Sequence, residues 1–306
     1  TEDADAKKVK DILIRICEGN DNNEITNQQI LDQLEADLNK MEASDIAPKN
    51  YRADVVKDNY KDFNDKFYGN NNVMVSNKSA LHGTHVSGII GAARNNGKGM
   101  DGVADNVRIM TLRAVPDGDE HDKDIALAIY YAVDNGAKVI NMSFGKGFSP
   151  EKKWVDDAVK YAESKGVLLV HAAGNDAKNL DTSFNYPTPI MLDQSRPNNW
   201  ITVGASGDPK AGGLTASFSN YGKNEVDVFA PGVKIYATVP GGNTYQNLQG
   251  TSMASPVVAG LAAMILEYFP TLSAAQVKMV IEKSSQNPGI DVNNPGTDEM
   301  VNLNEL

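Results

Sequence analysis

Residues 250–256 read Gly-Thr-Ser-Met-Ala-Ser-Pro and open an apolar stretch that continues to Leu266. Small neighbours leave the hydroxyl of Ser252 approachable, and the proline predicts a helix start, because a first helical turn tolerates proline. A helix N-terminus presents unpaired N–H groups and a positive dipole to developing negative charge. We therefore predict a nucleophile at Ser252. The alternative is an ordinary Ser/Thr helix cap.

A second stretch of small residues, His-Gly-Thr-His-Val-Ser-Gly at 82–88, predicts another helix that starts at His82 and ends near Ala93. Imidazole accepts a proton near neutral pH, which makes His82 a candidate general base. His82 and His85 lie one helical turn apart, a spacing that also suits two metal ligands. The zinc-protease pattern His-Glu-x-x-His needs a glutamate that is absent here, so we favour a base at His82 and a buried, hydrogen-bonded histidine at His85.

A third stretch, Val-Leu-Leu-Val-His-Ala-Ala-Gly-Asn at 167–175, predicts a buried strand that stops at a glycine and a primary amide. The side-chain N–H of Asn175 can donate to an oxyanion, and such donors stabilise the tetrahedral intermediate of acyl transfer. A Gly-Asn pair on its own is more often simply a turn. The three stretches together favour a hydrolytic site.

In the order His82, Asn175, Ser252, these motifs resemble those of the subtilisin-like serine peptidases, the subtilases. The resemblance runs from about Tyr51 to Ser285. It implies that His82 is the general base, that Ser252 is the nucleophile, and that Asn175 and the Ser252 N–H form the oxyanion hole. It therefore implies an endopeptidase that acts on proteins or peptides through an acyl-enzyme.

The resemblance also covers residues 141–145, Asn-Met-Ser-Phe-Gly, which are similar to the family's substrate-binding edge strand. By this resemblance Ser143, Phe144 and Gly145 would pair with an extended peptide through backbone hydrogen bonds. Phe144 either walls the side-chain pockets or is a core aromatic at a strand end. Both interpretations stay open at this point.

Ala172, Ala173 and Gly174 resemble one wall of the family's primary specificity pocket, and Asn185 aligns with its floor. A polar floor disfavours the largest aromatic side chains. The resemblance therefore implies that the largest aromatic side chains are disfavoured at the cleaved bond, and the sequence does not fix the preference further.

The family's aspartate stands in an Asp-Ser-Gly or Asp-Thr-Gly turn upstream of the histidine, and residues 1–81 contain no such tripeptide. Asp58 follows a short apolar stretch and is the best stand-in within the chain. We favour instead a strand upstream of Thr1, in which case the chain is a fragment of a longer precursor. A catalytically silent, peptide-binding relative is the alternative function, and an esterase or acyltransferase is a third.

The chain has 306 residues, with 29 basic and 40 acidic side chains and a net charge of −11. This balance argues against nucleic acid or an anionic membrane surface as a partner. The longest apolar stretch, Val257 to Leu266, is shorter than the ~20 residues that cross a bilayer, so we expect no membrane insertion. Cys17 is the only cysteine, which excludes an internal disulfide. A secreted, periplasmic or cell-surface location is implied by the resemblance alone.

Two regions differ in pattern. Residues 1–47 carry two amphipathic stretches and predict a helical hairpin, an insertion or appendage. Residues 48–306 alternate apolar strands with helices and predict a peptidase domain of the α/β class, a doubly wound, mainly parallel sheet flanked by helices. The expected elements are strands at 107–114, 138–142, 167–172, 200–205, 226–229 and 235–238, and helices at 122–135, 150–165, 251–268 and 273–284.

A calcium ion is the one cofactor to consider, because many subtilases bind it. The loop Arg94 to Gly99 offers amide and carbonyl oxygens, which suit a hard cation. No carboxylate lies within the loop and Lys98 adds positive charge, so a glycine-rich connection is the simpler interpretation. We predict no required cofactor and no metal-ligating side chains.

Overall fold

The computed structural model describes residues 52–116, 120–207, 214–286, 289, 291–296 and 300–302. Contacts divide the chain into two units, Thr1–Asn59 and Tyr60–Leu306. The described part of the first unit holds one short π-helix, η1 (Arg52–Val56). The helical hairpin predicted for residues 1–47 lies outside the described residues.

The second unit is built on a parallel four-stranded sheet with the strand order β1-β2-β3-β4. The strands are β1 (Val139–Met142), β2 (Leu168–Ala172), β3 (Trp200–Ser206) and β4 (Val228–Pro231). Every residue of β2 is buried, and so is β3 except for its last residue. Continuous apolar strands of this kind form when helices cover both faces of a sheet.

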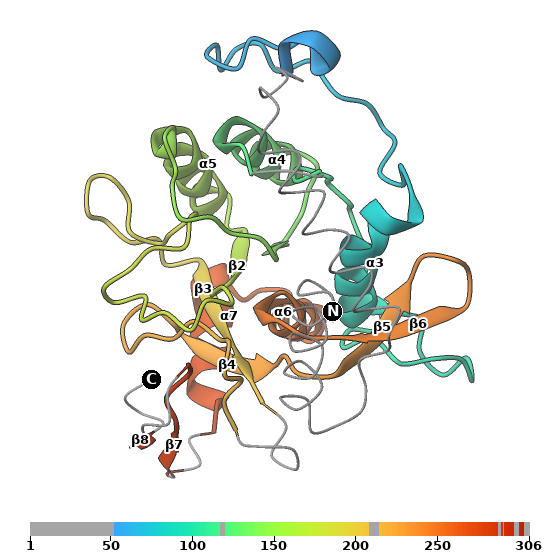
Figure 1. The fold of residues 1–306 in the computed structure, drawn as a ribbon, viewed down its shortest axis with the longest axis vertical. Coiled ribbons are helices and arrows are strands. Elements are labelled where there is room, and N and C mark those ends of the chain that lie inside the picture. The colour runs from blue at the N-terminus through green and yellow to red at the C-terminus, as the bar shows by residue number, and fades with distance from the viewer. Residues whose placement is uncertain are drawn as a thin grey trace, which may run out of the picture. The chain divides into compact units, whose positions relative to one another are not determined.

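Helices α4 (Asp122–Asp134) and α5 (Lys152–Ser164) cover one face, and α6 (Thr251–Tyr268) and α7 (Ala274–Ser284) cover the other (Figure 1). Alternate side chains of β2 and β3 pack against the helices on opposite faces of the sheet. Leu169 and Trp200 pack with α4 and α5, whereas Val170, Ile201 and Val203 pack with α6 and α7. This arrangement confirms the predicted doubly wound α/β sheet.

Helix α3 (Asn77–Gly91) lies beside an antiparallel hairpin of β5 (Ile235–Val239) and β6 (Thr244–Leu248) (Figure 1). A small apolar core joins α3, the hairpin and α6; its buried members are Val86, Ile89, Ala237 and Met253. A second short antiparallel pair, β7 (Asp291–Asn293) and β8 (Met300–Asn302), follows α7. The sequence did not predict β6, β7 or β8.

Three local predictions were wrong. Helix α3 begins at Asn77, five residues before His82, because Ser76 and Ser79 form a reciprocal capping box. Pro256 is the sixth residue of α6, in the second turn rather than the first. The strand expected at 107–114 pairs with none of the described strands, and β1 therefore ends the described sheet.

Helix α6 begins at Thr251 and ends at Tyr268, as predicted. Among the described residues it is the one helix long and apolar enough to cross a membrane by length and composition alone. Half of that stretch is buried inside the protein, and α6 contacts all four strands of the sheet as well as α3. These contacts are those of a central core helix.

Candidate active site

Ser252 is the second residue of α6, half-buried between buried neighbours on either side. Its hydroxyl donates a hydrogen bond of 3.3 Å to the carbonyl of Ser143, which follows strand β1. Gly250 caps the helix with a φ of 143°, a conformation that side-chain-bearing residues rarely adopt. The helix start therefore presents the Ser252 hydroxyl beside the end of β1.

The carbonyl of Ser252 is free of the helix ladder because Pro256, four residues later, has no N–H to donate. That carbonyl instead accepts the hydroxyl of Ser143 at 2.9 Å. The Ser143 oxygen accepts the amide of Asn141 at 2.9 Å, and the Asn141 side-chain oxygen accepts the hydroxyl of Ser255 at 2.8 Å. The missing N–H of Pro256 thus helps to hold the first turns of α6 against the end of β1.

The side-chain oxygen of Asn175 accepts two hydrogen bonds from Thr251, one from its N–H at 2.8 Å and one from its hydroxyl at 3.0 Å. The Thr251 hydroxyl in turn accepts the N–H of Gly174 at 3.0 Å. Since the Thr251 N–H can only donate, these bonds fix which end of the amide faces the helix. The Nδ2 group of exposed Asn175 has no acceptor among the described residues, which leaves it available to an anion.

His82 is exposed on α3, a helix that contacts α6. Its imidazole makes no hydrogen bond to any described residue, Ser252 included. Surrounding protein lowers the pKa of His82 below 6.5, first by removing water and second through the neighbouring His85. A histidine with a lowered pKa is neutral at pH 7 and can take up a proton. The structure brings the two helices together but does not form a bond between His82 and Ser252.

Asp58, the stand-in for the missing aspartate, belongs to the first unit. Its buried carboxylate accepts Nε and Nη2 of Arg52 at 3.1 and 2.9 Å. A bidentate pair of this kind holds both oxygens in place. The carboxylate of Asp58 is therefore engaged by a guanidinium.

Ser143, Phe144 and Gly145 continue the chain beyond β1. The ring of Phe144 packs on the α4/α5 side of the core and lies 6.3 Å from the ring of His171. Its carbonyl accepts Nε2 of His171 at 2.8 Å. Phe144 is thus at least a core aromatic at a strand end, one of the two interpretations left open by the sequence.

Asn185 occupies the space between the two segments that resemble the walls of the specificity pocket. Its amide donates to the carbonyls of Ala172 and Ala173 at 3.1 and 3.0 Å. A Cβ atom placed on Gly145 would lie 2.2 Å from Oδ1 of Asn185, and one on Gly174 would lie 3.2 Å from its Nδ2. Gly145 is therefore needed to admit this side chain, and a side chain at position 174 would crowd it.

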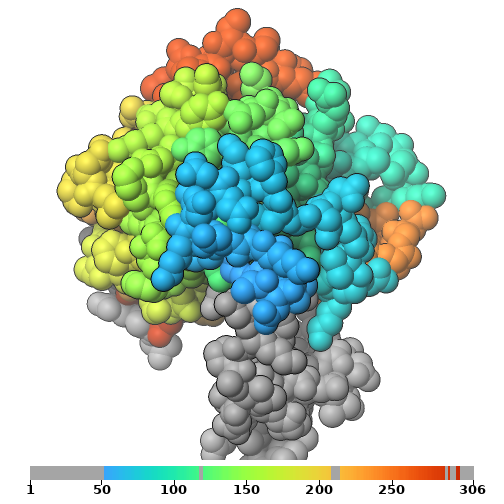
Figure 2. Space-filling model, turned by 90° about the horizontal axis from the view of Figure 1, so that it is seen from above, coloured from blue at the N-terminus to red at the C-terminus, as the bar shows by residue number. Residues whose placement is uncertain are grey.

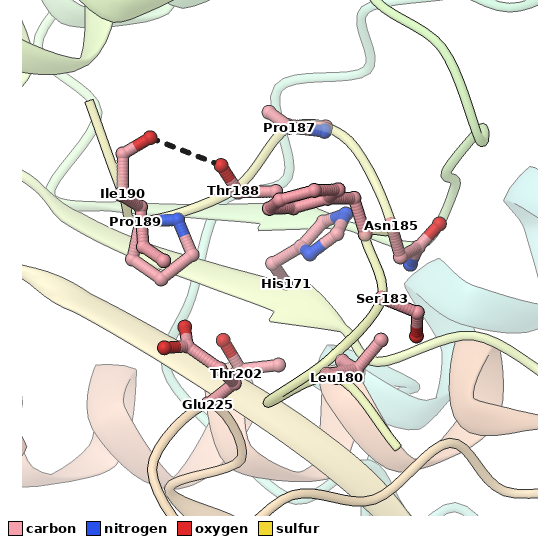
Figure 3. Close-up of a pocket in the computed structure, with 11 residues that line it drawn as sticks. His171, Leu180, Ser183, Asn185, Pro187, Thr188, Pro189, Ile190, Thr202 and Glu225 are labelled. Carbon is pink, nitrogen blue, oxygen red and sulfur yellow. Dashed lines mark hydrogen bonds between the residues drawn. The ribbon is translucent and has the colours of Figure 1, made fainter. Parts of the chain in front are cut away.

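A small pocket of about 20 Å³, enough for one water molecule, adjoins Asn185 (Figure 3). Its lining includes His171, Asn185, Thr188, Thr202 and Glu225. Burial lowers the pKa of His171 to about 4, so this imidazole is neutral at pH 7. His171 was assigned no role from the sequence, although a histidine within a predicted buried apolar strand is a visible signal.

Asn220 is a second residue that sequence reasoning missed. It is 1% exposed and donates to the carbonyl of Ala173 at 2.8 Å. Its side-chain oxygen accepts the N–H groups of Asp176 and Lys178 at 3.0 and 2.9 Å. It therefore fixes the loop that carries Asn175. Nothing in the local sequence distinguishes this asparagine from a turn residue.

Among the described residues, no three His, Cys, Asp or Glu side chains gather as metal ligands would. In the Arg94 to Gly99 loop, Asn96 accepts the N–H of Lys98 at 2.9 Å. The N–H of Asn95 bonds Asp101 at 3.1 Å. These side-chain oxygens fold the loop on itself. These contacts do not test the prediction that the loop is a simple connection without a required cation.

Comparison with known proteins identifies the family. A model described as "Subtilase family" matches residues 7–302. "Subtilisin DY" of Bacillus licheniformis is 42% identical over 212 residues, which are 68% of this chain and 71% of that protein. The chain belongs to the subtilase family.

Other relatives are longer. The "Thermophilic serine proteinase" of Bacillus sp. strain AK1 is 45% identical over 185 residues, 60% of this chain but 42% of that protein. The "Cell wall-associated protease" of Bacillus subtilis strain 168 is 36% identical over 78% of this chain and 25% of its own length. A solved structure of a cold adapted subtilisin-like serine proteinase is 30% identical, with a TM-score of 0.57 over 72% of this chain and 73% of that one.

Proposed function

We propose that the protein containing this chain is a serine endopeptidase, with Ser252 as nucleophile, His82 as general base and Asn175 as an oxyanion donor. Family membership supports the reaction class. The observation that carries the proposal is the orientation of Asn175, whose oxygen is held by Thr251 while its N–H group stays open. Donors fixed in advance at a nucleophile stabilise the oxyanion of acyl transfer.

His82 needs a carboxylate partner to hold its tautomer and stabilise its cation. No described residue hydrogen-bonds to it, and Asp58 is paired with Arg52. We therefore infer that the aspartate is contributed by a segment upstream of Thr1. The edge of β1 that pairs with no other described strand, and residues 107–114, whose Ile109 and Met110 are 43% and 40% exposed, offer places where another strand could pair.

Substrates are proteins or peptides that contact Ser143 to Gly145 through backbone hydrogen bonds. Asn185 fills much of the space between Gly145 and Gly174, so the pocket for the residue before the cleaved bond is shallow. Small side chains such as alanine fit best. The extracellular location follows the relatives, one of which is named a cell wall-associated protease.

Turnover of an internally quenched peptide tests the proposal, with a simple ester measured in parallel. This chain, an upstream-extended version and Ser252→Ala of each are compared. We expect Ser252-dependent peptide cleavage that is faster in the extended version. Ester hydrolysis without peptide cleavage would favour an esterase. Peptide binding with neither reaction, in both folded versions, would favour the silent peptide-binding relative.

A further inference from the structure

The hairpin of β5 and β6 is fastened to the helix that carries His82. His85, three residues after His82, is fully buried, and its Nε2 lies 3.0 Å from the carbonyl of Ile235 and 3.0 Å from that of Gln246. Ile235 is in β5 and Gln246 is in β6. One imidazole therefore bridges both strands of the hairpin to α3.

The chemistry of this bridge requires a particular form of His85. Because both neighbours of Nε2 are carbonyl oxygens, Nε2 must carry the hydrogen. The other nitrogen, Nδ1, is buried without a partner among the described residues. Burial lowers the pKa of His85, against a smaller opposing effect of the two carbonyls. His85 is therefore a neutral donor, which spares His82 a second positive charge beside it when it takes up a proton.

A second contact between the hairpin and α3 involves Thr84, the residue just before His85, and Gly88. The hydroxyl of Thr238 in β5 donates to the carbonyl of Thr84 at 3.0 Å. A Cβ atom on Gly88 would lie 2.1 Å from that hydroxyl oxygen. Only glycine at 88 admits Thr238 at this distance, so the hairpin and the helix are in direct contact.

The other end of the hairpin leads to the nucleophile. Strand β6 ends at Leu248 and α6 begins at Thr251. Ala237 of β5 and Met253 of α6 are buried in one apolar core with Val86 and Ile89 of α3. The outer side of the hairpin is covered as well, since a Cβ on Gly99 would lie 2.0 Å from the ring of Tyr245. In Figure 2 the loop around Gly99, in teal, meets the orange hairpin.

We propose that the β5–β6 hairpin is a rigid bridge that sets the position of His82 relative to Ser252, with His85 and Thr238 as positioning residues. The inference rests on the proposed function. The hairpin is fastened to the His82 helix by two side chains and a glycine contact, and it joins the Ser252 helix through a short connection. Loosening the bridge should misplace the base without removing any group that touches substrate.

The test uses the full chain with three changes at the bridge: Thr238→Val, Gly88→Ala and His85→Gln. Thr238→Ser keeps the hydroxyl. Thr244→Val is the matched control, because among the described residues the Thr244 hydroxyl bonds the carbonyls of Val239 and Pro240, both within the same hairpin. The first readout is the rate of covalent labelling of Ser252 by a fluorophosphonate, measured well below each variant's Tm.

We expect the three bridge variants to label about tenfold more slowly or worse, since a small misplacement of a catalytic group is costly. Thr238→Ser and Thr244→Val should label at close to the unchanged rate. Adding Thr238→Ala to Gly88→Ala should recover part of the loss, because it removes the clashing hydroxyl. Folded bridge variants that label at the unchanged rate would overturn the proposal.

A second readout does not depend on catalysis. NMR titration of the imidazole of His82 and hydrogen exchange of the hairpin amides are measured in the same variants. We expect a shifted His82 titration and at least tenfold faster exchange in Thr238→Val and Gly88→Ala, but not in Thr244→Val. Failure of the unchanged chain to label would count against the proposed function. The His82 titration and the hydrogen exchange of the hairpin amides would still test whether the hairpin positions His82. An unshifted His82 titration in every bridge variant would refute it.

Discussion

The side-chain oxygen of Asn175 accepts both the N–H and the hydroxyl of Thr251, at 2.8 and 3.0 Å. These two hydrogen bonds orient the amide so that its N–H group has no acceptor among the described residues. The orientation comes from Thr251, the residue just before Ser252, and therefore the proposed donor and the proposed nucleophile are both tied to the start of α6.

Asn175→Ala should lower kcat with little change in KM, because the lost donor acts on the transition state. In subtilisin, a relative of this chain, removing one such donor costs about 10²–10³ in kcat, and we expect a loss of that order. Steady-state kinetics on a peptide substrate measure it. Thr251→Val is the graded control: it keeps the N–H but loses the hydroxyl bond, and about a fivefold loss corresponds to one ordinary hydrogen bond. Equal kcat in Asn175→Ala and the unchanged enzyme would exclude the oxyanion role.

Pro256→Ala should stabilise the protein or leave its stability unchanged, and at the same time slow the labelling of Ser252. Alanine supplies an N–H that can reclaim the Ser252 carbonyl for the helix ladder, and Ser143 then loses its acceptor at 2.9 Å. Thermal unfolding and fluorophosphonate labelling of the same preparation measure the two effects. Ala259→Ser, further along α6, is a control for simple substitution in the buried helix. Faster labelling in Pro256→Ala would contradict this account of the proline.

Asn185→Gly should widen the preference for the residue before the cleaved bond. The amide of Asn185 now fills the space against Gly145 and Gly174, and its removal opens room for larger side chains. We expect kcat/KM for leucine or phenylalanine, relative to alanine, to rise at least about tenfold, the discrimination that a few methylene groups provide. Matched peptides that differ only at this residue measure the ratio. An unchanged ratio would mean that Asn185 does not bound the pocket.

His171 should make stability depend on pH in acid. Its pKa falls from 6.5 to about 4 on folding because the imidazole is buried. Between pH 4 and pH 6.5 the unfolded chain binds a proton at His171 that the folded protein does not bind. The free energy of unfolding is therefore highest above pH 6.5 and falls by up to about 3 kcal/mol as the pH drops to 4. Urea unfolding at several pH values measures this slope.

His171→Gln is the control for that slope, because glutamine can still donate to the Phe144 carbonyl but does not titrate. His82 and His85 also have lowered pKa values and contribute with the same sign in both proteins. The difference between the two slopes isolates His171. Identical slopes would show that His171 titrates normally.

Residues with a strong local signal were predicted well. The apolar runs of β2 and β3 predicted the doubly wound sheet, because burial leaves a pattern in nearby sequence. The small residues at the start of α6 predicted that Ser252 lies at a helix start. The start of α3 was predicted too late. The two serines of the capping box set the start of the helix, but they are less conspicuous in the sequence than the His82 motif. Strand β6 was missed because its polar residues Thr244, Gln246 and Asn247 leave no apolar alternation.

The supports of the site were harder to foresee. Asn220 and Thr251 act through hydrogen bonds to segments far away in the chain, and such pairings leave no periodic pattern. Pro256 was predicted to lie in the first turn, whereas its missing N–H leaves the Ser252 carbonyl free to accept the hydroxyl of Ser143, which follows β1. Tertiary partners of this kind appear only once the fold brings the segments together.

We propose that Ser252 is an activated nucleophile, and covalent labelling by a fluorophosphonate is the first experiment to make. The label is located by mass spectrometry in the folded chain, in its upstream-extended version and in Ser252→Ala of each. We expect a single adduct on Ser252, formed faster in the extended version and absent from both Ser252→Ala variants. No adduct on Ser252 in either folded version, or equal labelling of the Ser252→Ala variants, would contradict it.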